Sequence, residues 1–511
     1  MTDTLQRPLR LIALAVGLGF IADLLFYGHA PGISVPLFVL LCLAVLLSSA
    51  RTESRHVQPA NLWLGLAALL FAGFLALRLE PTLSFFNALA CLGLLVLQIA
   101  MFRRQPLYRL GILQYVIRGI LAGVEMAVRP IFLFLGLGRA FSQHSDQLHK
   151  LLPIMRGLVL AIPIALVFGA LLVSADSVFA SYVKQVFGFD IRGLDRIIPH
   201  ILLIGFISWA SIGAVLSALS EGSQPDMPAE GKTQPLPPHT PLVWRLGFGE
   251  ALTVLLVIDI LFGAFMLIQA AYLFGGLDTL SRTGMTYAEY ARRGFFELVA
   301  VVCLALGLLW LLAAITGRTT PGQERRFVGA SGLMVLLLLG MIVSGFQRMW
   351  LYELAYGFTH LRLYTHSFMI WLGLVLLIFL LSLLAARPAW FAFGGLVSAL
   401  ILLALLNIVN PDAVIARANI ERAIHPSDTQ LASGDGESYG RSYDIDGWYL
   451  SQLSADATPT LLELLPSMSA DDQSIVRAKL EEQRQELERI AAEDGWPSWH
   501  LSRARAMAVL R

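Results

Sequence analysis

Uninterrupted apolar runs of about 20 residues recur along most of this chain, and they constrain its fold more than any other feature. A run of this length is long enough to cross the hydrocarbon core of a bilayer as an α-helix. A transmembrane β-barrel would instead show short strands of alternating polarity. Only 14% of the 511 residues are charged, whereas soluble domains carry about 25%. The sequence therefore predicts an all-α fold, a polytopic transmembrane helical bundle with a small C-terminal α-helical extramembrane domain.

About 11 spans are predicted from these runs. They cover residues 9–27, 33–50, 60–77, 82–102, 153–173, 197–218, 249–274, 294–315, 327–347, 363–385 and 389–409. The region 103–150 is ambiguous, because Gln114, Arg118, Glu125 and Arg129 fall on one narrow stripe of an otherwise apolar helix. This pattern favours a helix that lies in the membrane interface. A span or a re-entrant hairpin is the alternative.

These runs divide the chain into four parts. The first transmembrane group covers 1–218, with about six spans and an interfacial or re-entrant helix near 105–140, and the second covers 249–411, with about five spans. A proline-rich segment, 219–248, reads as a cytoplasmic linker between them. The tail, 412–511, carries 17 acidic and 10 basic residues, and we expect a soluble, acidic, helical domain. Asn410-Pro411 and Ser469 predict the starts of two of its helices.

Lysine and arginine indicate the orientation, because cytoplasmic loops of membrane proteins are enriched in them. With the N-terminus placed inside, the cytoplasmic side holds 18 of these residues and the outer loops hold nine. Eight of the 18 lie in the ambiguous region between Arg103 and Arg156. The bias predicts a cytoplasmic N-terminus, and 11 spans then place the C-terminal domain on the extracytoplasmic side.

A charged stretch, YAEYARRGFFE, stands directly before the apolar run that forms the eighth predicted span. Thr286 and Glu289 match a capping box, so a helix is predicted to begin there. Arg293 lies one turn from both Glu289 and Glu297, which predicts a ladder of opposite charges. Paired charges at a capped helix end would explain the stretch completely. The alternative is that Arg292 and Arg293 face inward and bind an anion.

Other polar residues fall at a similar depth, in or near the outer leaflet. Ionisable groups within spans are costly in lipid and usually face the bundle interior. The candidate binding or functional cluster comprises Asp23, Asn87, Asp176, Asp259, Glu289, Arg292, Arg293, Glu297, Arg348, Arg362 and His366, with Asn407 at the same depth. Asp259 differs from the others because it lies near mid-bilayer, where it is either a hydrogen-bonded structural residue or a proton or cation site.

Known catalytic and cofactor motifs do not account for this sequence. No Cys/His cluster has the spacing of zinc ligands, and there is no phosphate-binding or dinucleotide-binding glycine motif. We therefore expect no metal, no cofactor and no assigned catalytic residue. The expected partners are the lipid bilayer and either an anionic lipid headgroup or an envelope protein, but not nucleic acid.

Several segments of the chain together carry a resemblance to a known family. The segments are IADLLFYGHAPGIS (21–34), LLVSADSVFA (171–180), IQAAYLFGG (268–276), TYAEYARRGFFELVAV (286–301), YGFTHLRLYTHSFMIW (356–371), LNIVNPDAVIARANIERA (406–423) and WYLSQLSADATPTLLELL (448–465). They resemble a bacterial integral membrane family, the domain-of-unknown-function family 4173, which is related to family 4153. The resemblance covers nearly the whole chain. It implies a multi-pass protein of the bacterial cytoplasmic membrane, and it supplies no reaction and no catalytic residue.

Three classes of function follow from these observations. The first is a non-enzymatic envelope sensor, regulator or assembly partner, which the distinct tail favours. The second is a transporter or lipid flippase, which the number of spans and Asp259 favour. The third is a membrane enzyme that acts on a lipid-linked substrate at the outer face. In that case Asp23 or Asp176 would be the base, and Arg292 and Arg293 would bind the phosphate.

Overall fold

The structure, a computed structural model, describes residues 2–142, 191–220, 246–274, 295–424 and 445–511. These residues form helices and loops, and their one isolated β-bridge joins Leu246 to Thr316. The all-α prediction is therefore confirmed. In the described part, 10 helices are long and apolar enough to cross a membrane, which confirms a polytopic helical bundle. They are α1 (Thr2–Phe26), α2 (Ser34–Thr52), α4 (Pro81–Met101), α5 (Ile112–Ser142), α8 (Ile191–Leu219), α9 (Phe248–Phe274), α12 (Phe295–Ile315), α13 (Pro321–Tyr356), α14 (His360–Leu384) and α15 (Pro388–Val409).

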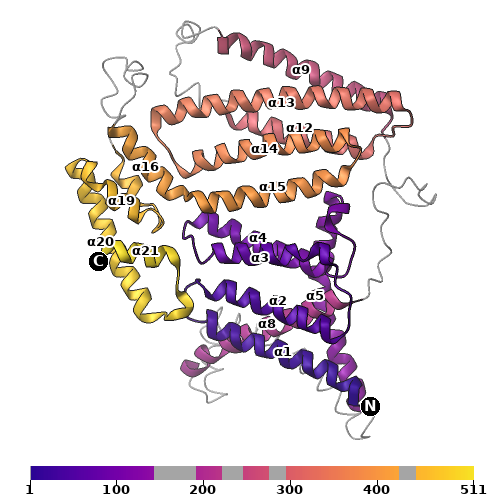
Figure 1. The fold of residues 1–511 in the computed structure, drawn as a ribbon, viewed down its shortest axis with the longest axis vertical. Helices are drawn as coiled ribbons and strands as arrows, with labels where there is room; N and C mark the ends of the chain where they lie inside the picture. Colours follow the sequence, from indigo (N-terminus) through magenta and orange to yellow (C-terminus); the bar gives the residue numbers. More distant parts are fainter. Residues whose placement is uncertain (1, 143–190, 221–245, 275–294, 425–444) are drawn as a thin grey trace, which may run out of the picture.

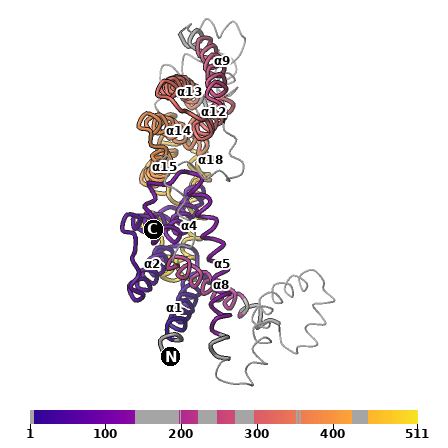
Figure 2. Tube along the Cα trace, turned by 90° about the vertical axis from the view of Figure 1, so that its right-hand side faces the viewer, coloured from indigo at the N-terminus to yellow at the C-terminus, as the bar shows by residue number. Residues whose placement is uncertain are grey.

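The helices form an elongated row rather than a ring (Figure 1). Neighbours along the row are α8, α1, α2, α3, α4, α15, α14, α13 and then α9, with α12 packed against α13 and α14. The side view shows that the row is narrow (Figure 2). The N-terminus lies at one end of the helices and the tail domain covers the opposite end, so we call these the N-terminal end and the tail end.

α15 connects the two transmembrane groups, because it contributes to both of their cores. Phe391 belongs to the core of α9, α12, α13 and α14. Leu396, Leu400 and Leu403 pack against the core of α3 and α4 on the other side of the helix. The two groups therefore meet at a seam along α15, which contacts α4 and the 3-10 helix η2 (Leu107–Arg109) of the first group.

The segment predicted as a span over 60–77 contains a shorter helix than we expected. α3 (Trp63–Phe74) has 12 residues, and a 3-10 helix, η1 (Pro59–Asn61), precedes it. The segment still runs the full length of α4. The Asn61 side chain donates to the Met101 carbonyl at the N-terminal end (2.8 Å), and the Leu79 N–H bonds to the tail domain at the other end. The segment covers this length because 3-10-type turns extend α3 at both ends, at η1 and where the Ala76 and Leu77 N–H groups bond to the Gly73 and Phe74 carbonyls, and a loop follows. A 3-10 helix also rises more per residue than an α-helix.

α5 runs across the ends of the other helices instead of alongside them (Figures 1 and 2). It crosses α4 near Met101, whose sulfur is 3.9 Å from Arg118 Nη1. It crosses α8 where the Ser217 hydroxyl donates to Glu125 (2.8 Å). Both crossings are at the N-terminal end. α5 also qualifies as a span by length and composition, and its placement in the interface stays a prediction.

The tail domain consists of five α-helices and two 3-10 helices in the described part. They are α16 (Pro411–Ile424), α18 (Gly447–Ser451), α19 (Thr458–Leu464), η3 (Leu465–Ser467), α20 (Ala470–Glu493), η4 (Trp496–Ser498) and α21 (Leu501–Leu510). The predicted helix starts at Pro411 and after Ser469 are confirmed, and the Ser469 side chain accepts from the Asp472 N–H. Several predictions lie outside the described residues, namely the span 153–173, most of the linker and the capping box at Thr286.

Gly213 allows α8 to approach α5 closely, which suggests a test of this crossing. A Cβ atom on Gly213 would overlap the backbone carbonyl of Met126, whereas a Cβ on Gly205, in the same helix, would meet open space. We expect Gly213→Ala to destabilise the protein by about 1–3 kcal/mol, because backbone must move apart. Gly205→Ala should be neutral or slightly stabilising, because alanine favours helix. Thermal unfolding in detergent measures both variants, and equal midpoints would contradict the crossing.

Candidate functional site

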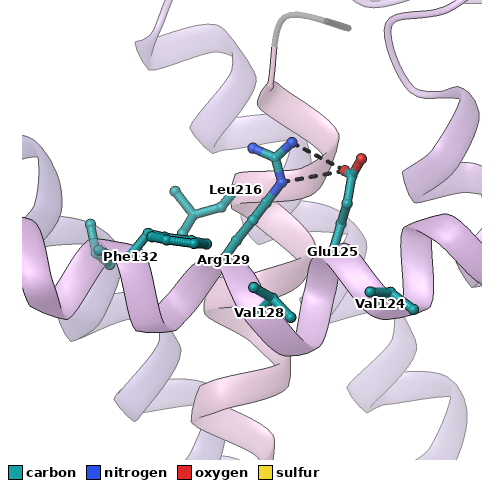
Figure 3. Close-up of a pocket in the computed structure, with 7 residues that line it drawn as sticks. Val124, Glu125, Val128, Arg129, Phe132 and Leu216 are labelled. Atoms are coloured by element: carbon teal, nitrogen blue, oxygen red, sulfur yellow. Dashed lines mark hydrogen bonds and ion pairs between the residues drawn. The ribbon is translucent and has the colours of Figure 1, made fainter. Parts of the chain in front are cut away.

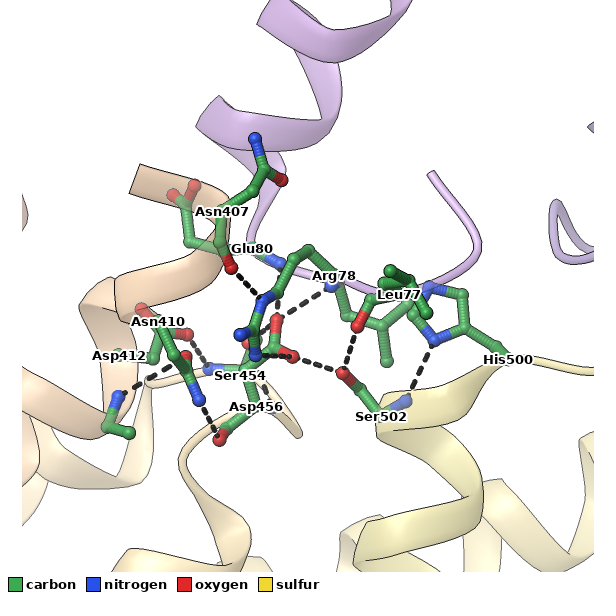
Figure 4. Close-up of polar contacts among 12 residues, drawn as sticks. Leu77, Arg78, Glu80, Asn407, Asn410, Asp412, Ser454, Asp456, His500 and Ser502 are labelled. Carbon is green, nitrogen blue, oxygen red and sulfur yellow. Dashed lines mark hydrogen bonds and ion pairs between the residues drawn. The ribbon is translucent and has the colours of Figure 1, made fainter. Parts of the chain in front are cut away.

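Polar groups from four separate chain segments converge where the tail domain meets the membrane helices (Figure 4). We call this set the tail junction. It comprises Arg78, Glu80, Asp412, Ser454, Asp456 and Ser502. The first two residues lie between α3 and α4, Asp412 lies in the first turn of α16, and the others belong to the tail loops and to α21.

Asp456 is the centre of the tail junction. Its carboxylate accepts hydrogen bonds from the backbone N–H groups of Leu79 (2.7 Å) and Glu80 (3.0 Å). The Ser502 hydroxyl contacts the same carboxylate, and Arg78 Nη1 lies 3.5 Å from it. The Asp456 side chain is 1% exposed. A buried charge is tolerated only when it is paired and hydrogen-bonded, and Asp456 meets both conditions.

Arg78 joins the two transmembrane groups to this carboxylate. Its Nε donates to the Asn407 carbonyl (2.6 Å) and its Nη2 donates to the Ile408 carbonyl (3.3 Å). These carbonyls belong to the last turn of α15, where helix carbonyls lack partners and the helix dipole favours a cation. A single side chain thus caps α15 of the second group from a loop of the first group.

Glu80 performs the complementary role at the start of α4. Its carboxylate accepts from the N–H groups of Thr82 (3.1 Å) and Leu83 (2.6 Å), as an N-cap does, and from the Tyr364 hydroxyl of α14 (2.6 Å). A carboxylate is stabilised at a helix N-terminus by unpaired N–H groups and by the dipole. Glu80 is 3% exposed, so this cap also links α4 to α14.

Asp412 ties the tail domain to the start of α14. It is fully buried, it accepts from the Ser454 N–H (2.8 Å), and it contacts His360 Nε2. The Tyr449 hydroxyl accepts from the His360 N–H (3.0 Å). Burial raises the pKa of Tyr449, so its hydroxyl keeps its proton at neutral pH.

The tail also contacts the connection between α1 and α2. The Ile33 N–H donates to the Trp499 carbonyl (2.9 Å), and the Ala30 N–H donates to Asp494 (3.0 Å). Gly32 has no side chain to keep the Trp499 carbonyl away. Apolar contacts contribute as well, since Leu363 of α14 packs against the buried cluster that contains Leu450 and Leu453, whereas Trp448 is 65% exposed.

The carboxylates of the tail junction are occupied by donors from the protein itself. A general base needs a free lone pair directed at a substrate, and these carboxylates accept from backbone N–H groups, hydroxyls and Arg78 instead. The described residues include no group of three or more His, Cys, Asp or Glu side chains that could hold a metal ion. The tail junction therefore holds structural elements together.

Seven of the 11 residues of the predicted cluster lie in the described part of the chain, on six different helices. They are Asp23, Asn87, Asp259, Glu297, Arg348, Arg362 and His366. Asp176, Glu289, Arg292 and Arg293 lie outside the described residues, and so does the predicted ladder around Arg293.

Two of these residues, Asp23 and Asn87, form polar pairs with a residue of a neighbouring helix. Asp23 of α1 accepts from His200 Nδ1 of α8 (2.7 Å), so the described candidate for an enzymatic base is already bonded. Asn87 of α4 and Asn407 of α15 exchange two amide hydrogen bonds of 2.8 Å each. The sequence placed Asn87 and Asn407 at the same membrane depth, and in the structure they bond to each other where the two groups meet.

In the second group, the predicted residues also bond to their neighbours. Arg348 of α13 donates to Gln269 of α9 (3.0 Å). His366 of α14 lies 2.9 Å from Glu353, and both side chains are buried. Arg362 donates to the Gly357 carbonyl. Glu297 is exposed on α12.

Asp259 is different, because it is buried without a hydrogen-bond partner among the described residues. It is 4% exposed, and neither carboxylate oxygen accepts a hydrogen bond. It lies in the middle of α9, beside the core that α9 shares with α13. A charged carboxylate is costly in such a place, which favours the protonated acid or an occupant that binds it.

Sequence reasoning did not single out the tail junction. Glu80-Pro81 carries a recognisable signal, an acidic N-cap before proline at the first helical position. Arg78 and Asp456, however, lie in loops, and their pairing depends on segments 376 or more residues apart.

Comparisons with known proteins identify the family. The family model described as "Domain of unknown function (DUF4153)" matches residues 64–464. The chain belongs to this family. The matched range includes Arg78, Glu80, Asp412 and Asp456, and it ends before α20 and α21. The match thus names the relative, family 4153, rather than family 4173. Neither the curated proteins nor the solved structures gave a match.

We expect Asp456→Ala to release the tail domain. Arg78 and two backbone N–H groups would lose their acceptor, and removing one partner of a buried ion pair costs about 3–5 kcal/mol. Limited proteolysis in detergent should then cleave the tail faster than in the parent protein. Asp471→Ala, an exposed residue in the first turn of α20, is the control. Unchanged protease resistance in Asp456→Ala would contradict the role of this carboxylate.

The tail domain should also lose stability in mild acid because of His500. This side chain is 2% exposed, its Nδ1 accepts from the Ser502 N–H (3.2 Å), and burial, with Arg503 nearby, lowers its pKa from 6.5 to about 4. The unfolded chain binds the proton more readily, so stability is complete above pH 6.5 and falls as the pH drops towards 4. The expected loss at pH 5 is about 2 kcal/mol.

Thermal unfolding at pH 7, 6 and 5 checks this expectation. His500→Asn is the matched variant, because asparagine can also cap α21 but does not titrate. The variant should show a flatter pH dependence than the parent protein. Identical slopes for the two proteins would assign the acid sensitivity to other groups.

Proposed function

We propose that the protein is a non-enzymatic regulator or assembly partner of the bacterial cell envelope, and that its tail domain engages another envelope protein. The observation that carries this proposal is the tail junction, which bonds the tail to both transmembrane groups. A force or a partner acting on the tail would therefore change the contacts of α4, α14 and α15 at the same time.

The tail surface supports a protein partner. Trp448, Ile475 and Trp496 are exposed on it, at 65%, 41% and 61% respectively. Tryptophan is enriched at the centres of protein interfaces. Ile475 lies near the start of α20 and Trp496 follows its end, and between them α20 presents charged side chains in exposed ion pairs, such as Arg484 with Glu481. Exposed aromatic side chains beside polar ones are suited to a protein partner.

We place the N-terminal end in the cytoplasm and the tail on the extracytoplasmic side of the bacterial cytoplasmic membrane. The two ends lie at opposite ends of the helices (Figure 1). Arginines concentrate at the N-terminal end, where α4 ends and α5 crosses it, namely at Arg103, Arg104, Arg109, Arg118 and Arg129. Enrichment of arginine is typical of the cytoplasmic side.

A transporter is the second candidate, because Asp259 is a buried acid without a hydrogen-bond partner in the described part. Proton-coupled transporters use such intramembrane carboxylates. The two candidates make opposite predictions for two substitutions. Regulation through the tail requires Asp456, whereas transport requires Asp259.

Complementation of a deletion strain separates them. Growth under osmotic, detergent and cell-wall stress would be measured with the parent gene, Asp456→Ala, Asp259→Asn and the control Asp471→Ala. Gly32→Val is a second way to loosen the tail, because it blocks the approach of the Trp499 carbonyl. Immunoblots of membranes check that all variants are present.

We expect Asp456→Ala and Gly32→Val to lose function, while Asp259→Asn and Asp471→Ala keep it. If Asp259→Asn alone abolishes complementation and the loosened tail does not, the transporter replaces the regulator.

A further inference from the structure

A groove at the N-terminal end of the molecule has no part in the proposed function. It lies in the angle where α5 crosses α8 (Figure 3), it has a volume of about 630 Å³, and we call it the α5–α8 groove. Its apolar wall consists of Val124, Val128, Phe132 and Leu133 of α5 and Leu216 of α8. Glu125 and Arg129 are its charged members.

The crossing that forms the groove is held by direct contacts. The Trp209 indole N–H donates to the Ala127 carbonyl (3.0 Å), and the Ser217 hydroxyl donates to Glu125 (2.8 Å). Gly213 allows the backbone of α8 to meet that of α5. The groove is therefore formed before any ligand binds, which is typical of small-molecule sites.

Basic residues surround the polar side of the groove. A second, small hollow shares Glu125 with it and is lined by Arg104, Arg118 and Ser217. Arg103 donates to the Leu219 carbonyl at the end of α8 (2.7 Å), so it lies in the same region. Four arginines, Arg103, Arg104, Arg118 and Arg129, thus stand against one acid, Glu125, a local net charge of +3.

We propose that the α5–α8 groove binds an anionic phospholipid from the membrane leaflet at the N-terminal end. The phosphate lies on the arginine side of the groove and an acyl chain lies along the apolar wall. Basic pockets between membrane helices on the cytoplasmic side are suited to anionic headgroups, and each arginine near the surface contributes to the attraction. The apolar wall excludes a free phosphate compound as the best ligand, because such a compound would leave it uncovered.

Charge also argues against a second copy of this chain as the occupant. A two-fold interface would place the same surface on both partners. The arginines would then face arginines, and like charges across an interface oppose association. A lipid phosphate instead reduces the local positive charge.

The Glu125–Arg129 ion pair provides a sharp test. Arg129 Nη2 lies 3.2 Å from Glu125 Oε2, and both side chains are partly exposed. Arg129→Gln and Glu125→Gln break the same ion pair, but the first lowers the local positive charge by one and the second raises it by one. A purely structural pair would make the two variants behave alike, whereas a phosphate site makes them behave in opposite ways.

Native mass spectrometry of the full-length protein would measure binding of phosphatidylglycerol, with phosphatidylcholine of the same acyl chains as the neutral probe. We expect Arg129→Gln to weaken phosphatidylglycerol binding about fivefold and Glu125→Gln to strengthen it by a similar factor. Val128→Trp, which fills the groove, should also reduce binding. Arg326→Gln is the matched control, because Arg326 is exposed in the first turns of α13, in the other transmembrane group.

Four results would overturn the proposal. Equal binding of the two lipids would mean that ordinary boundary lipid fills the groove. Equal losses in Arg129→Gln and Arg326→Gln, or parallel changes in Arg129→Gln and Glu125→Gln, would mean that no phosphate site exists there. Effective competition by glycerol 3-phosphate, which has the headgroup charge but no acyl chain, would assign the site to a soluble phosphate compound instead.

Discussion

The Asp456 carboxylate is the group around which the tail domain and both transmembrane groups are arranged. It bonds the loop between α3 and α4 and the start of α21, and it lies beside Arg78. The hydrogen bonds of Asp456 matter mainly because breaking one of them would leave a buried polar group without a partner. A buried donor or acceptor without a partner costs the full desolvation energy of the group, which exceeds the net gain from a single hydrogen bond. The tail therefore docks in one position, because any displacement leaves several buried groups unpaired.

The single-row arrangement explains why specific polar contacts are needed at the ends of the helices. Helices in a row present much of their surface to lipid, and lipid is as apolar as the side chains that face it, so apolar burial alone does not drive their association. The seam along α15 relies on specific contacts instead. The Asn87–Asn407 amide pair lies near the tail end of the seam, and the rings of Trp63 and Phe393 meet at the N-terminal end, 5.9 Å apart. With Arg78 added, the seam is fastened at both ends.

Local patterns in the sequence predict most of the helices, because each apolar run and each cap is a property of neighbouring residues. Ser469 and Asn410-Pro411 illustrate this, as does the capping box of Thr320 and Gln323 at the start of α13. The short length of α3 could not be predicted in this way, because an apolar run does not reveal where 3-10 turns replace α-helix.

The partners of polar residues are much harder to predict than the helices. The sequence marks His366 as notable, but its neighbour Glu353 lies on another helix. For Arg78 and Asp456, the pairing follows from how the whole chain folds, and neither residue differs locally from an ordinary loop charge. Depth alone did place Asn87 and Asn407 together, because two amides at the same level of adjacent helices can satisfy each other.

The separation of Glu80 and Asp456 along the chain, 376 residues, has a consequence for biosynthesis. The loop between α3 and α4 emerges from the ribosome long before its acceptor exists, so the first transmembrane group enters the membrane with the N–H groups of Leu79 and Glu80 unmatched. The last turn of α15 likewise gains Arg78 only when the two groups meet. Completion of the tail is therefore the event that closes the molecule. A chain that stops short of Asp456 leaves the N–H groups of Leu79 and Glu80 without their acceptor and Arg78 without its carboxylate partner.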